Sequence, residues 1–66
     1  MSATVIDPRD QLLTITEVSE LIKVPEPTLR QWRGAGEGPP SGKFGRHIRY
    51  RLGDVLDWID NRINAA

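Results

Sequence analysis

The side chains best suited to chemistry in this sequence are cations gathered in its middle. Residues 28–53 hold six basic residues and one acid, Glu37, which is a net charge of +5, although the whole 66-residue chain is formally neutral. The remaining residues must therefore carry −5. This separation predicts a polarised surface whose positive side suits an anionic partner. The six basic residues are Arg30, Arg33, Lys43, Arg46, Arg49 and Arg51.

Catalytic and metal chemistry has little support. The chain has one histidine, His47, and no cysteine, which leaves neither a disulfide nor a thiolate metal site. Asp54, Asp57 and Asp60 recur every third residue. On a helix this spacing is typical of a solvated acidic face, and such a face can also dock a basic partner. We therefore expect no enzyme, no catalytic or metal site, no cofactor and no small-molecule ligand.

Two short helical patterns joined by a turn occupy residues 16–36. Thr16 is expected to cap the first helix, Glu17 to Ile22 or Lys23, because its hydroxyl can accept from free amides of the first turn. The second helix is predicted from Glu26 to Arg33, with Pro27 in its first turn and glycines at its end. The turn and the second helix are expected to place Val24, Leu29 and Trp32 in the core.

Residues 42–51 alternate polar and apolar side chains, which is typical of strands. We predict strands over 42–44 and 47–50, joined by a tight turn at Gly45-Arg46 where glycine can take a positive φ. A last helix opens at Leu52-Gly53-Asp54. The alternation puts Phe44, Ile48 and Tyr50 on an inner face, with Lys43, His47, Arg49 and Arg51 on an outer basic face.

These elements predict a mainly α fold with a small β-hairpin, the winged helix-turn-helix. We expect residues 12–66 to form this domain and residues 1–11, interrupted by Asp7-Pro8, to form a flexible N-terminal arm. No apolar run approaches the roughly 18 residues of a membrane span, and no signal-peptide pattern is present. We therefore expect a cytoplasmic protein without a membrane partner.

The same elements carry a family resemblance. The chain resembles the phage excisionase family, within the MerR-like group of winged-helix proteins, over residues 12–63. One departure is Pro25, which stands where that group usually has a capping serine and so bears on where the second helix begins. The runs that carry the resemblance are Leu13–Ile22 (LTITEVSELI), Val24-Pro25, Thr28–Trp32 (TLRQW), Phe44–Arg51 (FGRHIRYR) and Asp54–Ile59 (DVLDWI).

On this fold the second helix would enter the major groove, where base edges carry distinct donors and acceptors. Gln31 can bond adenine bidentately, and Thr28 can offer a methyl to thymine or a hydroxyl to a base or phosphate. Arg30 and Arg33 flank this face and suit phosphates, although an arginine can also read guanine. Plain surface roles for Thr28 and Gln31 are the alternative. The candidate recognition residues are Pro27, Thr28, Arg30, Gln31 and Arg33.

The hairpin would act as a wing beside this helix. Arg46 at its tip suits a minor groove, where a narrow A·T-rich tract concentrates negative potential. Thr14 and Thr16, with the amides that open the first helix, can grip a phosphate, and simple capping is the alternative for Thr16. The candidate wing residues are Lys43, Arg46, His47, Arg49 and Arg51.

The resemblance implies a sequence-specific binder of double-stranded DNA, most simply an excisionase. Such proteins bind tandem sites cooperatively and head to tail, bend DNA and direct a phage integrase toward excision. We expect the acidic last helix of one copy to meet the basic wing of the next. A small MerR-like or AlpA-like phage or plasmid transcription regulator is the alternative, although these 66 residues lack the long pairing helix and effector domain of MerR-type regulators. A protein-interaction module that binds no DNA is the second alternative.

Overall fold

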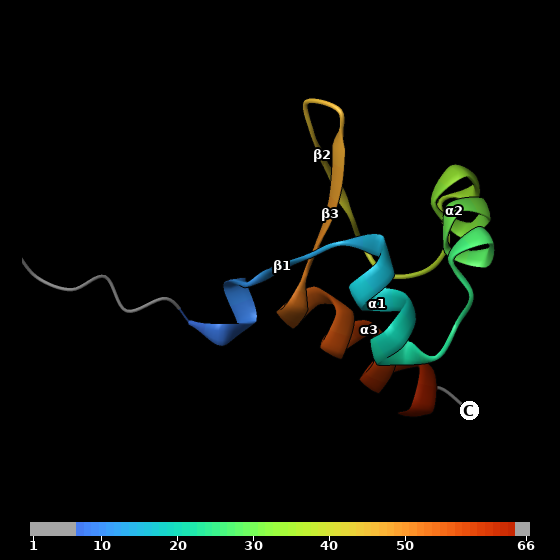
Figure 1. Cartoon of the computed structure of the whole chain (residues 1–66). Coiled ribbons are helices and arrows are strands. Elements are labelled where there is room, and N and C mark those ends of the chain that lie inside the picture. The colour runs from blue at the N-terminus through green and yellow to red at the C-terminus, as the bar shows by residue number, and fades with distance from the viewer. Residues whose placement is uncertain (1–6, 65–66) are drawn as a thin grey trace, which may run out of the picture.

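A three-stranded antiparallel sheet and three α-helices build the fold in the computed structural model, which describes residues 7–64 (Figure 1). This arrangement confirms the predicted winged helix-turn-helix. The elements are the short 3₁₀ helix η1 (Pro8–Asp10), β1 (Leu12–Leu13), α1 (Ile15–Ile22), α2 (Glu26–Ala35), β2 (Gly42–Phe44), β3 (His47–Arg51) and α3 (Leu52–Asn64).

The sheet has the strand order β1-β3-β2, so β3 lies in its centre. β2 and β3 form the predicted hairpin around Gly45-Arg46, and Gly45 has the positive φ, 63°, that this turn requires. The sheet has one strand more than the predicted hairpin. This third strand, β1, pairs antiparallel with β3 and places Leu13 opposite Tyr50. The base of the wing is thereby fixed to the chain that leads into α1.

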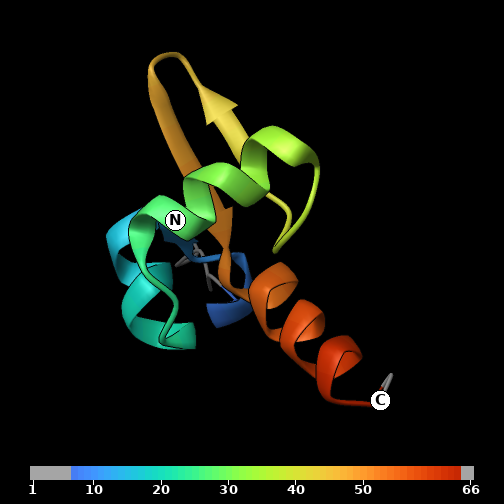
Figure 2. The ribbon, with the colours of Figure 1, turned by 90° about the vertical axis from the view of Figure 1, so that its right-hand side faces the viewer.

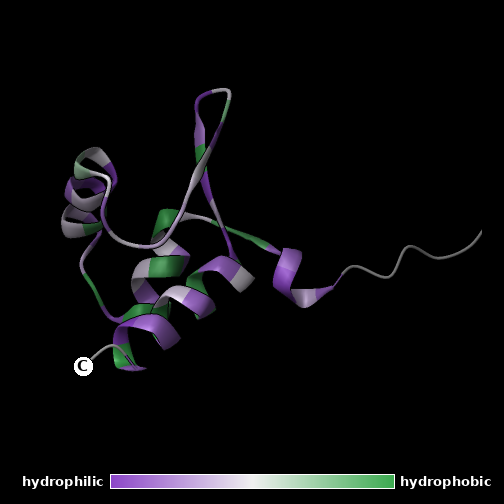
Figure 3. Cartoon of the chain, turned by 180° about the vertical axis from the view of Figure 1, so that it is seen from behind, coloured by the Kyte–Doolittle hydropathy of each residue, from purple (hydrophilic) through white to green (hydrophobic). Residues whose placement is uncertain are grey.

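The core takes one buried side chain from each of five elements. All five are at most 7% exposed, and partly buried apolar residues of α1, α2 and α3 pack around them. Figure 3 shows apolar residues concentrated on α1 and β1, whereas most of α2 and of the wing is hydrophilic or neutral. The buried residues are Leu13 on β1, Val18 on α1, Leu29 on α2, Tyr50 on β3 and Val55 on α3.

The first helix begins two residues earlier than its predicted start. Its N-cap is Thr14 and not Thr16. The Thr14 hydroxyl accepts from the Glu17 amide at 3.1 Å, and the Glu17 carboxylate accepts from the Thr14 amide at 2.8 Å. This reciprocal pair is a capping box, which satisfies two amides where a hydroxyl at Thr16 would satisfy one.

The second helix runs to Ala35, two residues past its predicted end. Glycine at position 34 does not stop it, because Gly36 provides the left-handed residue that ends a helix, with a φ of 75°. At the other end Pro25 is the N-cap without a side-chain hydrogen bond, and Pro27 lies in the first turn as predicted. The departure from a capping serine therefore leaves the start of α2 at the predicted Glu26.

A flexible arm was expected over residues 1–11, but residues 7–11 are ordered against α3. Residues 1–6 lie outside the described part of the chain. Asp7 caps η1, and the Arg9 guanidinium donates to the Asp57 carboxylate at 2.7 Å and to the Gly53 carbonyl at 3.1 Å. A Cβ on Gly53 would stand 3.0 Å from the Arg9 Cβ. This segment is therefore held against the first turns of α3.

The third helix is joined to α2 through aromatic side chains. The rings of Trp32 and Trp58 are 5.7 Å apart and tilted by 47°, a favourable aromatic geometry. The Arg62 guanidinium lies over the Trp58 ring at 5.3 Å. These contacts help to fix the angle at which α2 stands on the rest of the domain.

Candidate nucleic-acid interface

The second helix buries one side and exposes a polar one. Leu29 is 1% exposed and Trp32 is half-buried against the core. Thr28 is half-buried at the edge of the exposed face, which leaves a smaller part of it accessible than the sequence predicts. The exposed members of the predicted recognition set are Pro27, Arg30, Gln31 and Arg33.

The wing and α2 both extend away from α3 (Figure 1, Figure 2). Arg46 lies in the two-residue turn at the far end of the wing, and its side chain is exposed as predicted. A helix that presents polar side chains, with a hairpin whose tip carries a cation, can occupy a major groove and the neighbouring minor groove of one duplex.

The two faces of the wing differ from those predicted by simple alternation. Residues paired across antiparallel strands share a face. Phe44 pairs with His47, and Lys43 pairs with Ile48. Phe44 therefore lies on the outer face and Lys43 on the inner face, so the predicted positions of both residues are wrong. Across a two-residue turn, an even-numbered residue of one strand pairs with an odd-numbered residue of the other and shares its face. Alternation counted straight through the turn instead assigns all even-numbered residues to one face.

Three cations consequently lie on the side where α2 faces the sheet. Tyr50, on the inner face of β3, is buried beside Leu29 of α2. Burial raises the pKa of the Tyr50 phenol, and the charges of Arg33 and Arg30 oppose that rise. Both guanidinium groups are thus close enough to act on this phenol, and Lys43 lies further along the same face of the wing. This cluster could neutralise a phosphate strand running between a helix and a wing.

The outer face of the wing combines cations with exposed apolar side chains. His47 and Arg51 are exposed, and Arg49 is half-buried because its guanidinium donates to the Ile48 carbonyl at 2.8 Å. A shallow groove beside these arginines is lined partly by apolar residues that the sequence analysis did not place there. They are Leu12, 47% exposed, and Phe44, 55% exposed.

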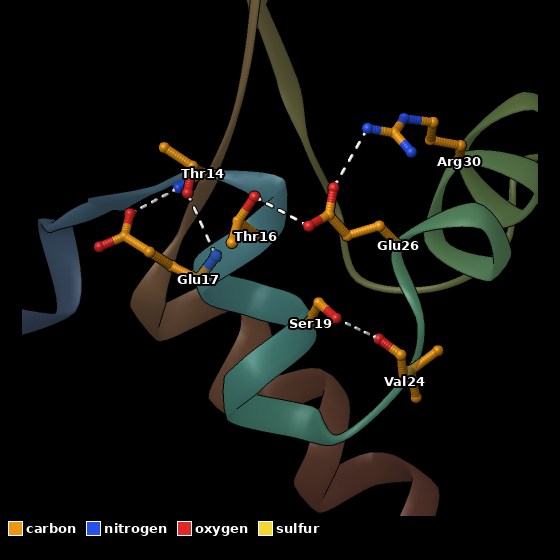
Figure 4. A network of polar contacts seen from close by, with 7 residues as sticks. All are labelled: Thr14, Thr16, Glu17, Ser19, Val24, Glu26 and Arg30. Carbon is orange, nitrogen blue, oxygen red and sulfur yellow. Dashed lines mark hydrogen bonds and ion pairs between the residues drawn. The ribbon is translucent and has the colours of Figure 1, made fainter.

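The hydroxyls predicted to touch a phosphate both have partners within the protein (Figure 4). Thr14 belongs to the capping box, and the Thr16 hydroxyl donates to the Glu26 carboxylate at 2.9 Å. Glu26 also accepts from Arg30 at 3.1 Å. Two carboxylates, those of Glu17 and Glu26, therefore stand at the start of α1, where they repel a phosphate.

Glu26 is a member of this surface that the sequence analysis omitted. It opens α2, and its pairing with Arg30 follows the i, i+4 spacing of a helical ion pair. That spacing is readable from the sequence. The bond to Thr16 is not, since it depends on how the two helices cross. An exposed pair of this kind is worth only about 0.3–0.5 kcal/mol in stability.

The remaining titratable groups form no second site in the described part of the chain. Residues 7–64 contain no cluster of histidine, cysteine or acidic side chains able to hold a metal ion. Of the acidic row on α3, Asp57 binds Arg9, and Asp60 is exposed. None of the helices described is long and apolar enough to cross a membrane.

The geometry defines a winged helix-turn-helix with a polar helix and a cationic wing on one side. Comparison with known families agrees, because residues 12–63 match the family of helix-turn-helix domains. The chain belongs to this family, which consists of DNA-binding domains and not of enzymes and includes excisionase-like and AlpA-type members. No curated protein matches the sequence.

Proposed function

We propose that this protein binds double-stranded DNA sequence-specifically, with α2 in a major groove and the wing tip in the adjacent minor groove. The observation that carries this proposal is that α2 and the wing both extend away from α3 (Figure 2). The polar residues Arg30, Gln31 and Arg33 of α2 are exposed, and so is Arg46 in the turn of the wing. Residues 28–53, which include most of α2 and the whole wing, hold six basic residues and one acid. This positive charge also favours α2 and the wing as the part of the protein that binds an anion.

Within this arrangement some residues contact base edges and others contact phosphates. Gln31 and Pro27 are exposed on α2 and contact base edges, and the half-buried Thr28 contributes less. Arg33 and Lys43 neutralise the phosphates between the two grooves. Arg46 enters the minor groove, and His47 follows it at the start of β3.

Two alanine variants test this division. Arg46→Ala should weaken binding to every duplex and reduce the slope of log K against log salt by about 0.9, because one cation is lost. Gln31→Ala should relax base preference and leave the slope unchanged. Anisotropy titrations with a selected and a scrambled duplex measure both. Loss of base preference in the first variant and not the second would reverse the assigned roles of wing and helix.

We further propose an excisionase-like role on bacterial DNA in the cytoplasm, with several copies bound head to tail beside a phage integrase. Support for a contact between copies comes from exposed apolar side chains on the wing and on α3, which lie near arginines in the first case and near Asp60 in the second. The wing patch joins Phe44 and Leu12 to arginines. On α3, Ile63 is 69% exposed and follows Asp60 by one turn. A heterologous contact between such patches repeats along DNA instead of closing into a dimer.

Footprinting on a phage attachment region tests this role. Several adjacent protected sites in one orientation, with protection that rises cooperatively, are the expected result. A single palindromic site would contradict it and favour the transcription regulator. Binding to a partner protein with no protection of DNA would favour the interaction module instead.

A further inference from the structure

One carboxylate joins the two helices of the helix-turn-helix. The two Glu26 oxygens have different partners: Oε2 accepts from the Thr16 hydroxyl of α1 at 2.9 Å, and Oε1 accepts from Nη2 of Arg30 at 3.1 Å (Figure 4). The Glu26 side chain is 32% exposed and that of Arg30 is 56% exposed. The guanidinium is thus accessible to a ligand while one of its nitrogens is held.

This carboxylate opposes general attraction to DNA. A negative charge beside Arg30 cancels much of that cation's pull on any phosphate, and phosphate attraction is the part of binding that ignores sequence. If Arg30 bound a DNA phosphate, an acid at this position would therefore lower affinity for every duplex alike. A contact between Arg30 and a base edge would not carry this cost.

The held geometry suits a base edge. A guanidinium has five N–H donors in a planar fork, so a bond from Nη2 to Glu26 leaves donors free toward solvent. Because Glu26 is itself anchored to Thr16, the plane of the fork is restricted relative to α1 as well as to α2. A restricted fork matches the two fixed acceptors of guanine, O6 and N7, better than it matches freely placed phosphate oxygens.

We propose that Glu26 is a positioning residue that aims Arg30 at a guanine in the major groove, and that Thr16 holds Glu26 in place. The proposal rests on the proposed DNA binding and deepens it by naming the base that one residue reads. For Arg30 the sequence alone favours a phosphate and leaves guanine as an alternative, and the proposal adopts that alternative.

The test compares binding to two duplexes. One is selected by the wild-type protein from a random library, and the other is its scrambled counterpart; the ratio of their dissociation constants is the discrimination. Arg30→Ala should lower discrimination on the order of tenfold, as expected for loss of a bidentate base contact. Glu26→Gln should lower it several-fold and bind the scrambled duplex more tightly, with a salt slope steeper by about 0.9 as Arg30 reaches phosphates.

Matched variants separate positioning from charge and from folding. Glu20→Gln changes the net charge equally at an exposed position of α1, and it should leave discrimination unchanged. Thr16→Val replaces the hydroxyl that binds Glu26 by a methyl group and should lower discrimination without a change of charge. In the Arg30→Ala background, Glu26→Gln should have no further effect on discrimination, because the two residues act as one unit. Circular dichroism confirms that each variant is folded.

Several results would overturn the proposal. Unchanged discrimination in Glu26→Gln is one, and an equal loss with or without Arg30 is another, since Glu26 would then contact DNA itself. If Arg30→Ala weakened both duplexes equally and flattened the salt slope, Arg30 would be a phosphate contact. If the wild-type protein bound no duplex at all, the proposed function would fail as well, and this result is distinct from the others.

Discussion

At the scale of single residues, Tyr50 connects the core to the candidate interface. It is 1% exposed, lies on the central strand β3, and is close enough to Arg33 and Arg30 to be affected by their charge. The sequence predicts a core role for this residue, and burial confirms it. Tyr50 is therefore a core residue that also senses the charge of the α2 arginines.

Tyr50 predicts how stability depends on alkaline pH. Burial raises its pKa above the ordinary 10.0 because the folded state disfavours the charged phenolate, with the two arginines opposing. Its contribution is fully present below about pH 10 and is lost as pH rises through the higher folded pKa. Tyr50 is the single tyrosine of the chain, so tyrosinate absorbance reports it alone.

The expected midpoint of this absorbance lies above pH 10 in the folded protein and near 10 in denaturant. Urea unfolding should also show that Tyr50→Phe loses less stability than the wild type between about pH 10 and 12. A folded midpoint at or below the denatured one would contradict this prediction.

At the scale of elements, the capping box of α1 allows a direct comparison of two threonines. Thr14→Ala should destabilise the domain by about 1 kcal/mol, because its hydroxyl caps the Glu17 amide. Thr16→Ala loses only an exposed bond to Glu26 and should cost less. Denaturant unfolding of both variants checks this order. A greater loss at Thr16 would restore it as the cap.

Helical and strand periodicity predicts these elements better than it predicts their ends. The spacing of Leu29 and Trp32 identifies the buried side of α2, but the end of that helix depends on which glycine takes the left-handed conformation. β1 is two residues long, and its pairing with β3 is a long-range contact that local periodicity does not contain. The faces of Phe44 and Lys43 likewise depend on the register across the turn.

The candidate site follows the same division. Exposed members of α2 and the tip residue Arg46 are where the sequence predicts them, since helix period and turn chemistry determine both. The bonds from Thr16 to Glu26 and from Arg9 to Asp57 join different elements. These two contacts depend on tertiary packing and so were not predictable from spacing alone.

At the scale of the whole molecule, the described surface has a basic side and an acidic row on α3. Asp57 is a poor position for testing contacts between copies because it also holds Arg9. Asp60 is exposed and is the better choice. Asp60→Lys should reduce cooperative binding to adjacent sites and leave binding to a single site nearly unchanged.

Asp10→Lys provides the control for this variant, because it makes the same charge change at an exposed position in η1. It should leave cooperativity intact. Titration of duplexes that carry one or two adjacent sites measures the difference. Unchanged cooperativity in Asp60→Lys would contradict the head-to-tail contact through α3.

The central claim, that α2 and the wing bind duplex DNA through this basic side, is tested most directly by the salt dependence of binding. Fluorescence anisotropy of a labelled duplex should show binding near 50–100 mM salt that weakens as salt rises to about 200 mM. With three or four phosphate contacts, log K should fall linearly against log salt with a slope of about −2.7 to −3.6. Absence of binding near 50–100 mM, or an affinity independent of salt, would contradict the claim.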